Sequence, residues 1–164
     1  MPEKKDGPIR PTDDEARALA RGLLDGARFA ALAVMEPGTA MPMVSRVAMG
    51  TTPKGAPLTL ISTLSGHTTA LTANPACSLL VGEPGEKGDP LTHPRLTLQC
   101  SAEFLTGAAA QNAEMRQHYL QAHPKAKLYI DFADFRFVAF RVLRGYLNGG
   151  FGKAFHLTPA DLGL

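Results

Sequence analysis

The sequence predicts a β-rich α+β fold, an antiparallel meander or barrel with flanking helices. Five strand-like runs lie between residues 28 and 105, and short turns join most of them, which favours antiparallel neighbours. One amphipathic helical pattern precedes these runs, and a second helical pattern follows them. A chain of 164 residues is long enough to bury one core of ordinary size.

Composition narrows the class of protein. Hydrophobic residues make up 45% of the chain and charged residues 20%, as in an ordinary globular protein. The formal net charge of +2 and the scattered Lys and Arg residues argue against nucleic acid as a partner. No apolar stretch approaches the roughly 18 residues of a membrane span, and the charged N-terminus lacks the apolar segment of a signal peptide. We therefore expect a cytoplasmic protein.

Residues 1–11 contain three prolines and five charged residues, so we expect a flexible N-terminal arm. Residues 12–164 are then expected to form a single domain. Thr12 and Glu15 have the spacing of a capping box, and apolar residues at helical spacing follow to about Gly26. The sequence therefore predicts one amphipathic helix ahead of the strands.

The rest of the chain divides into strands and one further helix. Expected strands cover residues 28–35, 42–50, 58–62, 76–82 and 95–105, and a sixth covers residues 137–147. A helix over residues 108–123 separates the last two, and Pro124 ends it because proline disfavours helical geometry in the residue before it.

Cys77 and Cys100, the two cysteines of the chain, each lie in a strand-like run. They could meet as neighbours in the sheet, and the simpler interpretation is two buried thiols. No C-x-x-C pattern predicts a metal site or a disulfide framework.

The stretch from Ser62 to Thr69 is the richest in chemistry. It holds five hydroxyl side chains, Gly66 and His67 within eight positions, between a strand and a short helix that ends at Asn74. The first amides of that helix have no partner inside it, so amides and hydroxyls could together hold an anion. Arg46, on a neighbouring strand, would supply a bidentate charge. Alternatively, the hydroxyls only cap the helix and Arg46 is a surface residue.

The remaining candidates are a glycine-rich segment near the C-terminus and the histidines. The glycines at 149, 150 and 152 lack the setting of a dinucleotide fingerprint, and they form either a plain loop or a close approach to a planar ligand. No histidine has a partner at metal-ligand spacing, so we assign no metal ion. His93 and His156 stay open as ligands of a haem. No nucleophile with a neighbouring base is recognisable, and no residue is assigned to catalysis.

Together these segments resemble the pyridoxamine 5'-phosphate oxidase-like, FMN-binding split-barrel superfamily, and within it the haem-utilisation (HugZ-type) branch. The resemblance covers roughly residues 15–155. It rests on the order and spacing of several segments, which are residues 42–47, 61–71, 74–75, 88–97, 118–126, 132–135 and 149–154.

The resemblance implies a six-stranded antiparallel Greek-key split barrel that forms a homodimer, with FMN at the subunit interface. It also implies that the flavin contacts come from three regions of the chain. These are Ser45, Arg46 and Val47 beside the phosphate or ring edge; Ser62, Thr63, Ser65, His67 and Thr68 along the ribityl chain and phosphate; and Arg95, Phe151 and Lys153 near the ring.

Two departures from the oxidase pattern bear on function. Gly66-His67 stands where that pattern has Arg-Lys, so two fixed charges become one titratable charge. The chain also has no Trp, which argues against vitamin B6 oxidation. The resemblance thus implies an FMN-dependent oxidoreductase acting on an unidentified small substrate. The alternatives are a haem-binding or haem-degrading protein, and a flavin or haem carrier without turnover.

Overall fold

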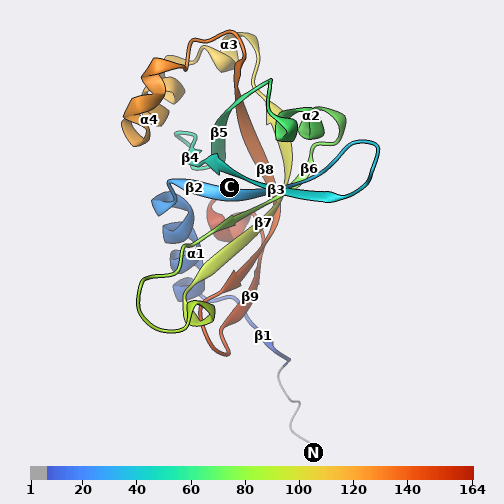
Figure 1. Cartoon of the computed structure of the whole chain (residues 1–164). Coiled ribbons are helices and arrows are strands. Elements are labelled where there is room, and N and C mark those ends of the chain that lie inside the picture. Colours follow the sequence, from blue (N-terminus) through green and yellow to red (C-terminus); the bar gives the residue numbers. More distant parts are fainter. Residues whose placement is uncertain (1–6) are drawn as a thin grey trace, which may run out of the picture.

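The computed structural model describes residues 7–164, and most of the elements that the sequence predicts are present (Figure 1). Six long strands match the six expected runs. They are β2 (Phe29–Met35), β3 (Pro42–Ala48), β5 (Pro57–Ser62), β6 (Ala76–Val81), β7 (Arg95–Phe104) and β8 (Phe135–Asn148).

The expected count of six strands is not confirmed, because the described residues form nine. The three additional strands are β1 (Ile9–Arg10), β4 (Gly50–Thr51) and β9 (Ala154–Leu157). Segments of two to four residues are too short to show an alternating pattern, so periodicity could not reveal them. The expected β-rich α+β class is confirmed, and the count of six strands in a Greek-key barrel is not.

The sheet follows the order β1-β9-β8-β7-β6-β2-β3, and β5 joins it by pairing with β8 and with β4. All these pairs are antiparallel except β1 with β9. The parallel pair arises because Ile9 and Arg10 pair with Ala154 and Phe155. These two residues belong to the segment expected to be a flexible arm, and residues 1–6 of that arm lie outside the described residues.

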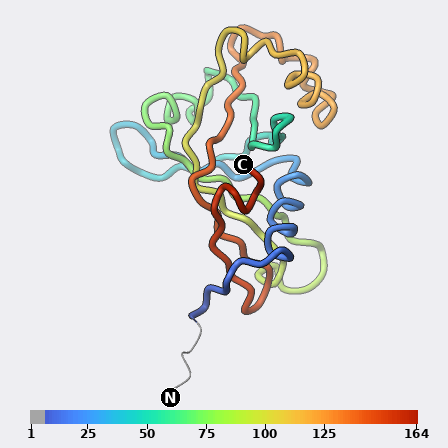
Figure 2. Tube along the Cα trace, turned by 180° about the vertical axis from the view of Figure 1, so that it is seen from behind, coloured from blue at the N-terminus to red at the C-terminus, as the bar shows by residue number. Residues whose placement is uncertain are grey.

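Helix α1 (Asp14–Gly26) packs against the sheet and buries Ala16, Ala20 and Leu24. The predicted capping box is wrong. Asp13 occupies the N-cap position and accepts a 2.8 Å hydrogen bond from the Ala16 amide. The C-terminal 3₁₀ turn η3 (Ala160–Leu162) packs beside α1, near the C-terminus marked in Figures 1 and 2, whereas the first described residues lie beside β9.

The second predicted helix is divided in two. Helix α3 (Gly107–Ala110) ends at Gln111, and α4 (Ala113–Ala122) begins after Asn112, whose side chain accepts from the Met115 amide. Both helices lie at the end of the sheet opposite β1 and β9 (Figure 1). Helix α4 contributes to a small second core around Tyr119 and Phe137, while the main core lies between α1 and the inner sheet face.

Three short helical segments complete the described chain: α2 (Gly66–Ala73) after β5, η1 (Pro90–Thr92) before β7, and η2 (Pro124–Leu128) after α4. No helix among residues 7–164 is long and apolar enough to cross a membrane.

Candidate functional site

The hydroxyl-rich junction between β5 and α2 is held together by its own side chains. The Ser62 hydroxyl donates a 2.7 Å hydrogen bond to the carboxylate of Asp134, and the Thr68 hydroxyl donates a 2.6 Å bond to the Ser62 carbonyl. Ser65 occupies the N-cap position of α2 without a capping bond from its side chain, and Thr63 is exposed. Two of the predicted phosphate-binding hydroxyls are therefore engaged inside the chain.

His67 lies beside β3 rather than in open solvent. Its Nδ1 is 3.0 Å from the hydroxyl of Ser45, and its Nε2 is buried without a hydrogen-bond partner among the described residues. Burial lowers the pKa of His67, which favours the neutral imidazole. Ser45 and His67, which are both among the expected flavin contacts, are thus brought together, but the pair carries no fixed positive charge.

Arg46 lies on the other face of β3. Side chains alternate along a strand, so Arg46 points away from the face that Ser45 shares with the buried Val47. Its guanidinium carbon sits 5.0 Å from the centre of the Phe29 ring, at cation–π distance.

The residues of this junction do not fit a flavin phosphate within one chain. A carboxylate, Asp134, stands at the junction, His67 favours its neutral form, and Arg46 faces the opposite side of the strand. A doubly charged phosphate needs opposite charges or free donors at hydrogen-bond distance. The described chain offers few of either here.

Arg95, Phe151 and Lys153 lie together near the far end of the sheet. Arg95 donates to the carbonyls of Leu91 and His93, at 3.0 and 3.3 Å, and so holds the loop that precedes β7. Phe151 and Lys153 lie in the turn between β8 and β9, where Phe151 is 85% exposed. The glycine-rich stretch is therefore a hairpin turn, in which Gly150 and Gly152 adopt φ of 118° and 67°.

Both ring nitrogens of His93 are hydrogen-bonded within its own loop. Its Nδ1 accepts a 2.8 Å hydrogen bond from the Gly85 amide, and its Nε2 lies 2.9 Å from the carbonyl of Lys87. Because an accepting Nδ1 leaves Nε2 as the protonated nitrogen, the second contact is a donated bond. Neither nitrogen is free to bind a metal.

Unlike His93, His156 has no hydrogen bond to either ring nitrogen within the described residues. All five histidines lie within residues 7–164, and His156 is the one whose two ring nitrogens both lack a hydrogen-bond partner there. The residue is exposed, and its ring meets the ring of Tyr146 edge to face at 5.0 Å. Tyr146 lies directly opposite His156 on β8.

His156 begins a row of side chains that crosses the exposed sheet face. Directly opposed residues share a face, so the pairings place one row across six strands. In order from β9 to β3 it contains His156, Tyr146, Thr97, Leu80, Ala31 and Arg46. The row offers an imidazole at one end, a guanidinium at the other, and mostly apolar or aromatic contact between. Sequence reasoning missed this row, since its six members come from six different strands.

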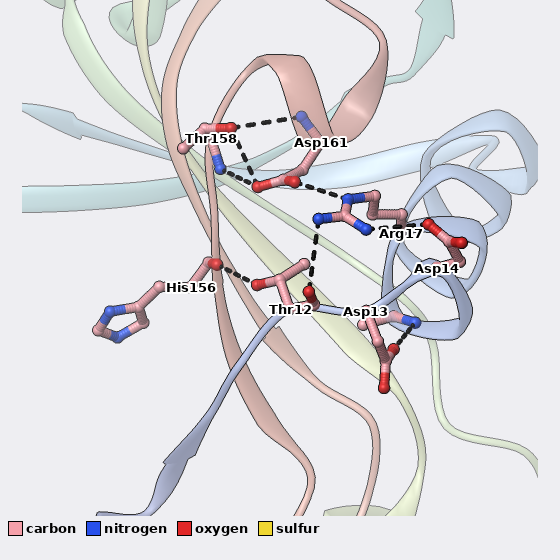
Figure 3. A network of polar contacts seen from close by, with 8 residues as sticks. Thr12, Asp13, Asp14, Arg17, His156, Thr158 and Asp161 are labelled. Carbon is pink, nitrogen blue, oxygen red and sulfur yellow. Dashed lines mark hydrogen bonds and ion pairs between the residues drawn. The ribbon is translucent and has the colours of Figure 1, made fainter.

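A polar network anchors the backbone at His156 and at Thr158, the residue that follows β9 (Figure 3). The Thr12 hydroxyl donates a 2.7 Å bond to the His156 carbonyl, and Arg17 donates from Nε to Asp161 at 2.7 Å. Asp161 in turn accepts from the amide and the hydroxyl of Thr158, at 2.8 and 3.0 Å. Figure 3 shows the imidazole of His156 pointing away from this network, so the backbone is anchored while the ring stays free.

The described residues thus form a β-rich α+β protein with one exposed, histidine-bearing sheet face. The chain matches the family model described as CREG, beta-barrel over residues 11–162, and it belongs to that family. The predicted resemblance to the split-barrel superfamily is also confirmed by structural similarity. A protein of the pyridoxinephosphate oxidase family from Clostridium acetobutylicum covers 92% of this chain and 99% of its own, with a TM-score of 0.66. At 14% identity, that likeness concerns the fold alone.

Two relatives have names that refer to haem. The chloroplastic haem oxygenase HOZ of Arabidopsis thaliana is 38% identical over 97 residues, which are 58% of this chain and 28% of HOZ. A haem-binding protein from Mycobacterium smegmatis is 30% identical with a TM-score of 0.80, over 94% of this chain and 61% of that protein. This chain spans less than two thirds of the length of either relative.

Proposed function

We propose that this chain binds haem on its exposed sheet face, with His156 as the iron ligand. The observation that carries the proposal is the free imidazole of His156, on a strand whose backbone is anchored. A neutral imidazole nitrogen is the commonest protein ligand of haem iron. Of the two histidines that the sequence left open, His93 is engaged in its loop, so His156 remains.

The surroundings of His156 suit a planar, anionic ligand. Tyr146 packs edge-on against the imidazole and limits its rotation. Arg144 is exposed, lies two residues from Tyr146 on the same strand, and has no ion-pair partner in the described part of the chain. Its guanidinium can receive a haem propionate through charge-assisted hydrogen bonds. Leu80, 43% exposed in the same row, offers apolar contact to the porphyrin.

Haem, when bound, would supply redox and oxygen chemistry, and the chain's own residues would hold and orient it. The names of the two relatives, a haem oxygenase and a haem-binding protein, support a haem-related role. A haem carrier and a haem-degrading enzyme both need this iron ligand, so the ligand alone does not distinguish between them.

A haemin titration tests the proposal. We expect the wild-type chain to give a Soret band at one haem per chain. His156→Ala should lose that band or weaken haem affinity by about tenfold or more. His118→Ala is the matched control, because His118 is also exposed but contacts Thr51 through Nε2 at 3.2 Å. Equal affinity in His156→Ala and wild type would remove His156 as the ligand. Decay of the Soret band with ascorbate and oxygen would then separate a degrading enzyme from a carrier.

An FMN-dependent oxidoreductase is the second candidate, favoured by the split-barrel fold and by the unpaired first amides of α2. In this proposal the chain is a homodimer, and Arg46, which faces away from the β5–α2 junction of its own chain, would supply the positive charge to the junction of the other copy. Arg46→Ala should then weaken FMN binding by about 1.5–3 kcal/mol in a flavin titration. Sedimentation with and without each cofactor would show whether a dimer forms. The single domain over residues 12–164 and the cytoplasmic location remain part of this proposal.

A further inference from the structure

A cavity of about 500 Å³ lies beside the small second core, near α3 and α4. Leu60 and Phe137 line it, and both are buried members of that core. They are direct partners in the antiparallel pair of β5 and β8, so their side chains share one face of the sheet. Small-molecule sites in proteins usually measure about 300–1,000 Å³, so this cavity is large enough for a ligand of one or two rings.

The side chains that line the cavity beside these two residues are apolar and aromatic. Phe135 lies two residues before Phe137, and therefore on the same face of β8, and it packs against the second core. Leu105 and Ile130 also pack in this core or against it. The ring of Phe132, which is 57% exposed, meets the Phe135 ring edge to face at 6.3 Å. Aromatic lining of this kind favours a further ring held edge-on or offset.

The space exists because the residues that α3 contributes are small. Gly107 and Ala110 line the cavity, and α3 buries none of its residues. A Cβ atom added at Gly107 would meet no other atom within 4 Å. The second core is therefore not filled on the side of α3, and a ligand ring held there would remove apolar surface from water.

Arg116 supplies a positive charge at the cavity. Its side chain is only 20% exposed, and one guanidinium nitrogen, Nη2, pairs with the carboxylate of Asp131. The other guanidinium nitrogens have no hydrogen-bond partner among residues 7–164, so they are free to donate. Arg136 also borders the cavity, but alternation along β8 turns its side chain to the face opposite Phe137, and its Nη1 donates to two backbone carbonyls. Arg116 is therefore the cation that an anionic ligand would meet.

We propose that this cavity binds an aromatic monocarboxylate, whose ring packs against Phe135 and Phe137 and whose carboxylate pairs with Arg116. An arginine guanidinium matches a carboxylate through two parallel hydrogen bonds. The Asp131 side chain is 78% exposed, so it can turn into solvent and leave Arg116 to the ligand. An ion pair with so exposed a partner contributes little to stability, and the exchange of one carboxylate for the other therefore costs little.

This site is independent of both cofactor proposals. Neither His156 nor Arg144 lines the cavity, and none of the expected flavin contacts lines it. The test is therefore made on protein free of haem and flavin, where failure of one proposal leaves the others untouched.

The probe is 2-naphthoate, titrated into the whole chain and followed by its own fluorescence, which no Trp of the protein overlaps. We expect one site per chain. The uncharged analogue 2-naphthalenemethanol should bind about tenfold more weakly or worse, because it cannot pair with the guanidinium. Arg116→Met should weaken naphthoate binding by a similar factor and leave the alcohol nearly unchanged. Asp131→Asn removes the competing carboxylate, so it should tighten naphthoate binding a few-fold without affecting the alcohol.

A second pair of variants tests the cavity itself. Ala110→Leu fills part of the space and should weaken binding of both probes by about tenfold or more, whereas Ala109→Leu, at an exposed position of α3 outside the cavity, should not.

Amide chemical shifts of the wild-type chain during the naphthoate titration need no variant, should a substitution unfold the protein. Shifts centred on Leu60, Thr106 and Phe137 support the site. Shifts confined to the row from His156 to Arg46, equal affinity for naphthoate and the alcohol, or the absence of saturable binding would overturn it.

Discussion

The hydroxyl of Thr12 donates a 2.7 Å hydrogen bond to the backbone carbonyl of His156, and so ties the entry to α1 to the middle of β9. The two residues are 144 positions apart in the chain. The bond uses the carbonyl of His156 and leaves its imidazole free. A residue before the first helix thereby fixes the strand that presents the proposed iron ligand.

Replacing Thr12 with Val removes this donor while keeping the shape of the side chain. The His156 carbonyl then loses a partner, and we expect the free energy of unfolding to fall by about 0.5–1.5 kcal/mol. Haem affinity should fall a few-fold as well, because β9 is held less firmly. Urea unfolding and haemin titration measure the two effects. Thr69→Val is the control, since Thr69 is exposed and its hydroxyl makes no hydrogen bond within residues 7–164. An equal loss in both variants would mean that the bond does not position β9.

Asp161 makes the stability of the β9 anchor depend on pH. The Thr158 amide and Arg17 hold the pKa of Asp161 below its ordinary value. A lowered folded-state pKa contributes stability above the unfolded value of about 3.9, and that contribution is lost as pH falls through the lower folded value. Asp161→Asn should therefore lower stability by about 1 kcal/mol near neutral pH, and the deficit should shrink below about pH 4.

Urea midpoints of wild type and Asp161→Asn, compared at neutral and acid pH, measure this difference. Asp14 is the other carboxylate that pairs with Arg17, and its side chain is fully exposed. Asp14→Asn should therefore lower the free energy of unfolding by less than about 0.5 kcal/mol. A deficit in Asp161→Asn that stays constant down to acid pH would contradict the assignment.

Removing the hydroxyl of Tyr119 should raise the stability of the fold. Its hydroxyl is buried without a hydrogen-bond partner among the described residues, and burial raises its pKa. The ring itself packs edge-on to Phe137 and beside His123. Tyr119→Phe keeps the packing and removes the unpaired group, so stability should rise by about 1 kcal/mol. Thermal unfolding measures it, with the half-buried Tyr129→Phe as a neutral control. A clear loss of stability would show that a water or another group satisfies the hydroxyl.

The long strands and the first helix could be predicted from the sequence, because each shows the hydrophobic periodicity of its own kind of element. Alternation over residues 43–49 and the helical spacing of Ala16, Ala20 and Leu24 both reflect one buried face, and both elements formed. The capping residue was wrong by one position, since Thr12 and Asp13 are both good caps and only the long-range bond to His156 decides between them.

The site could not be predicted in the same way. Arg46 and His67 looked like neighbours because their strands are close in sequence, yet alternation along β3 turns Arg46 to the other face. The row around His156 depends on the order β9-β8-β7-β6-β2-β3, which no local pattern contains. The free imidazole of His156 and the engaged imidazole of His93 differ only in tertiary contacts.

Gly82 and Gly22 should respond in opposite directions to the same substitution. Gly82 ends β6 at φ of 100°, and a Cβ there would lie 2.6 Å from the Pro94 carbonyl and 2.8 Å from the Arg95 Cα, both backbone atoms. Gly82→Ala combines this overlap with a left-handed backbone, so stability should fall by about 2 kcal/mol or more. Gly22 lies inside α1 with open space around its Cβ position, and Gly22→Ala should raise stability by about 0.5–1 kcal/mol. Urea unfolding of both variants measures the contrast. A tolerated Gly82→Ala would mean that the loop before Arg95 can move away from β6, and the ordering assigned to His93 and Arg95 would then be wrong.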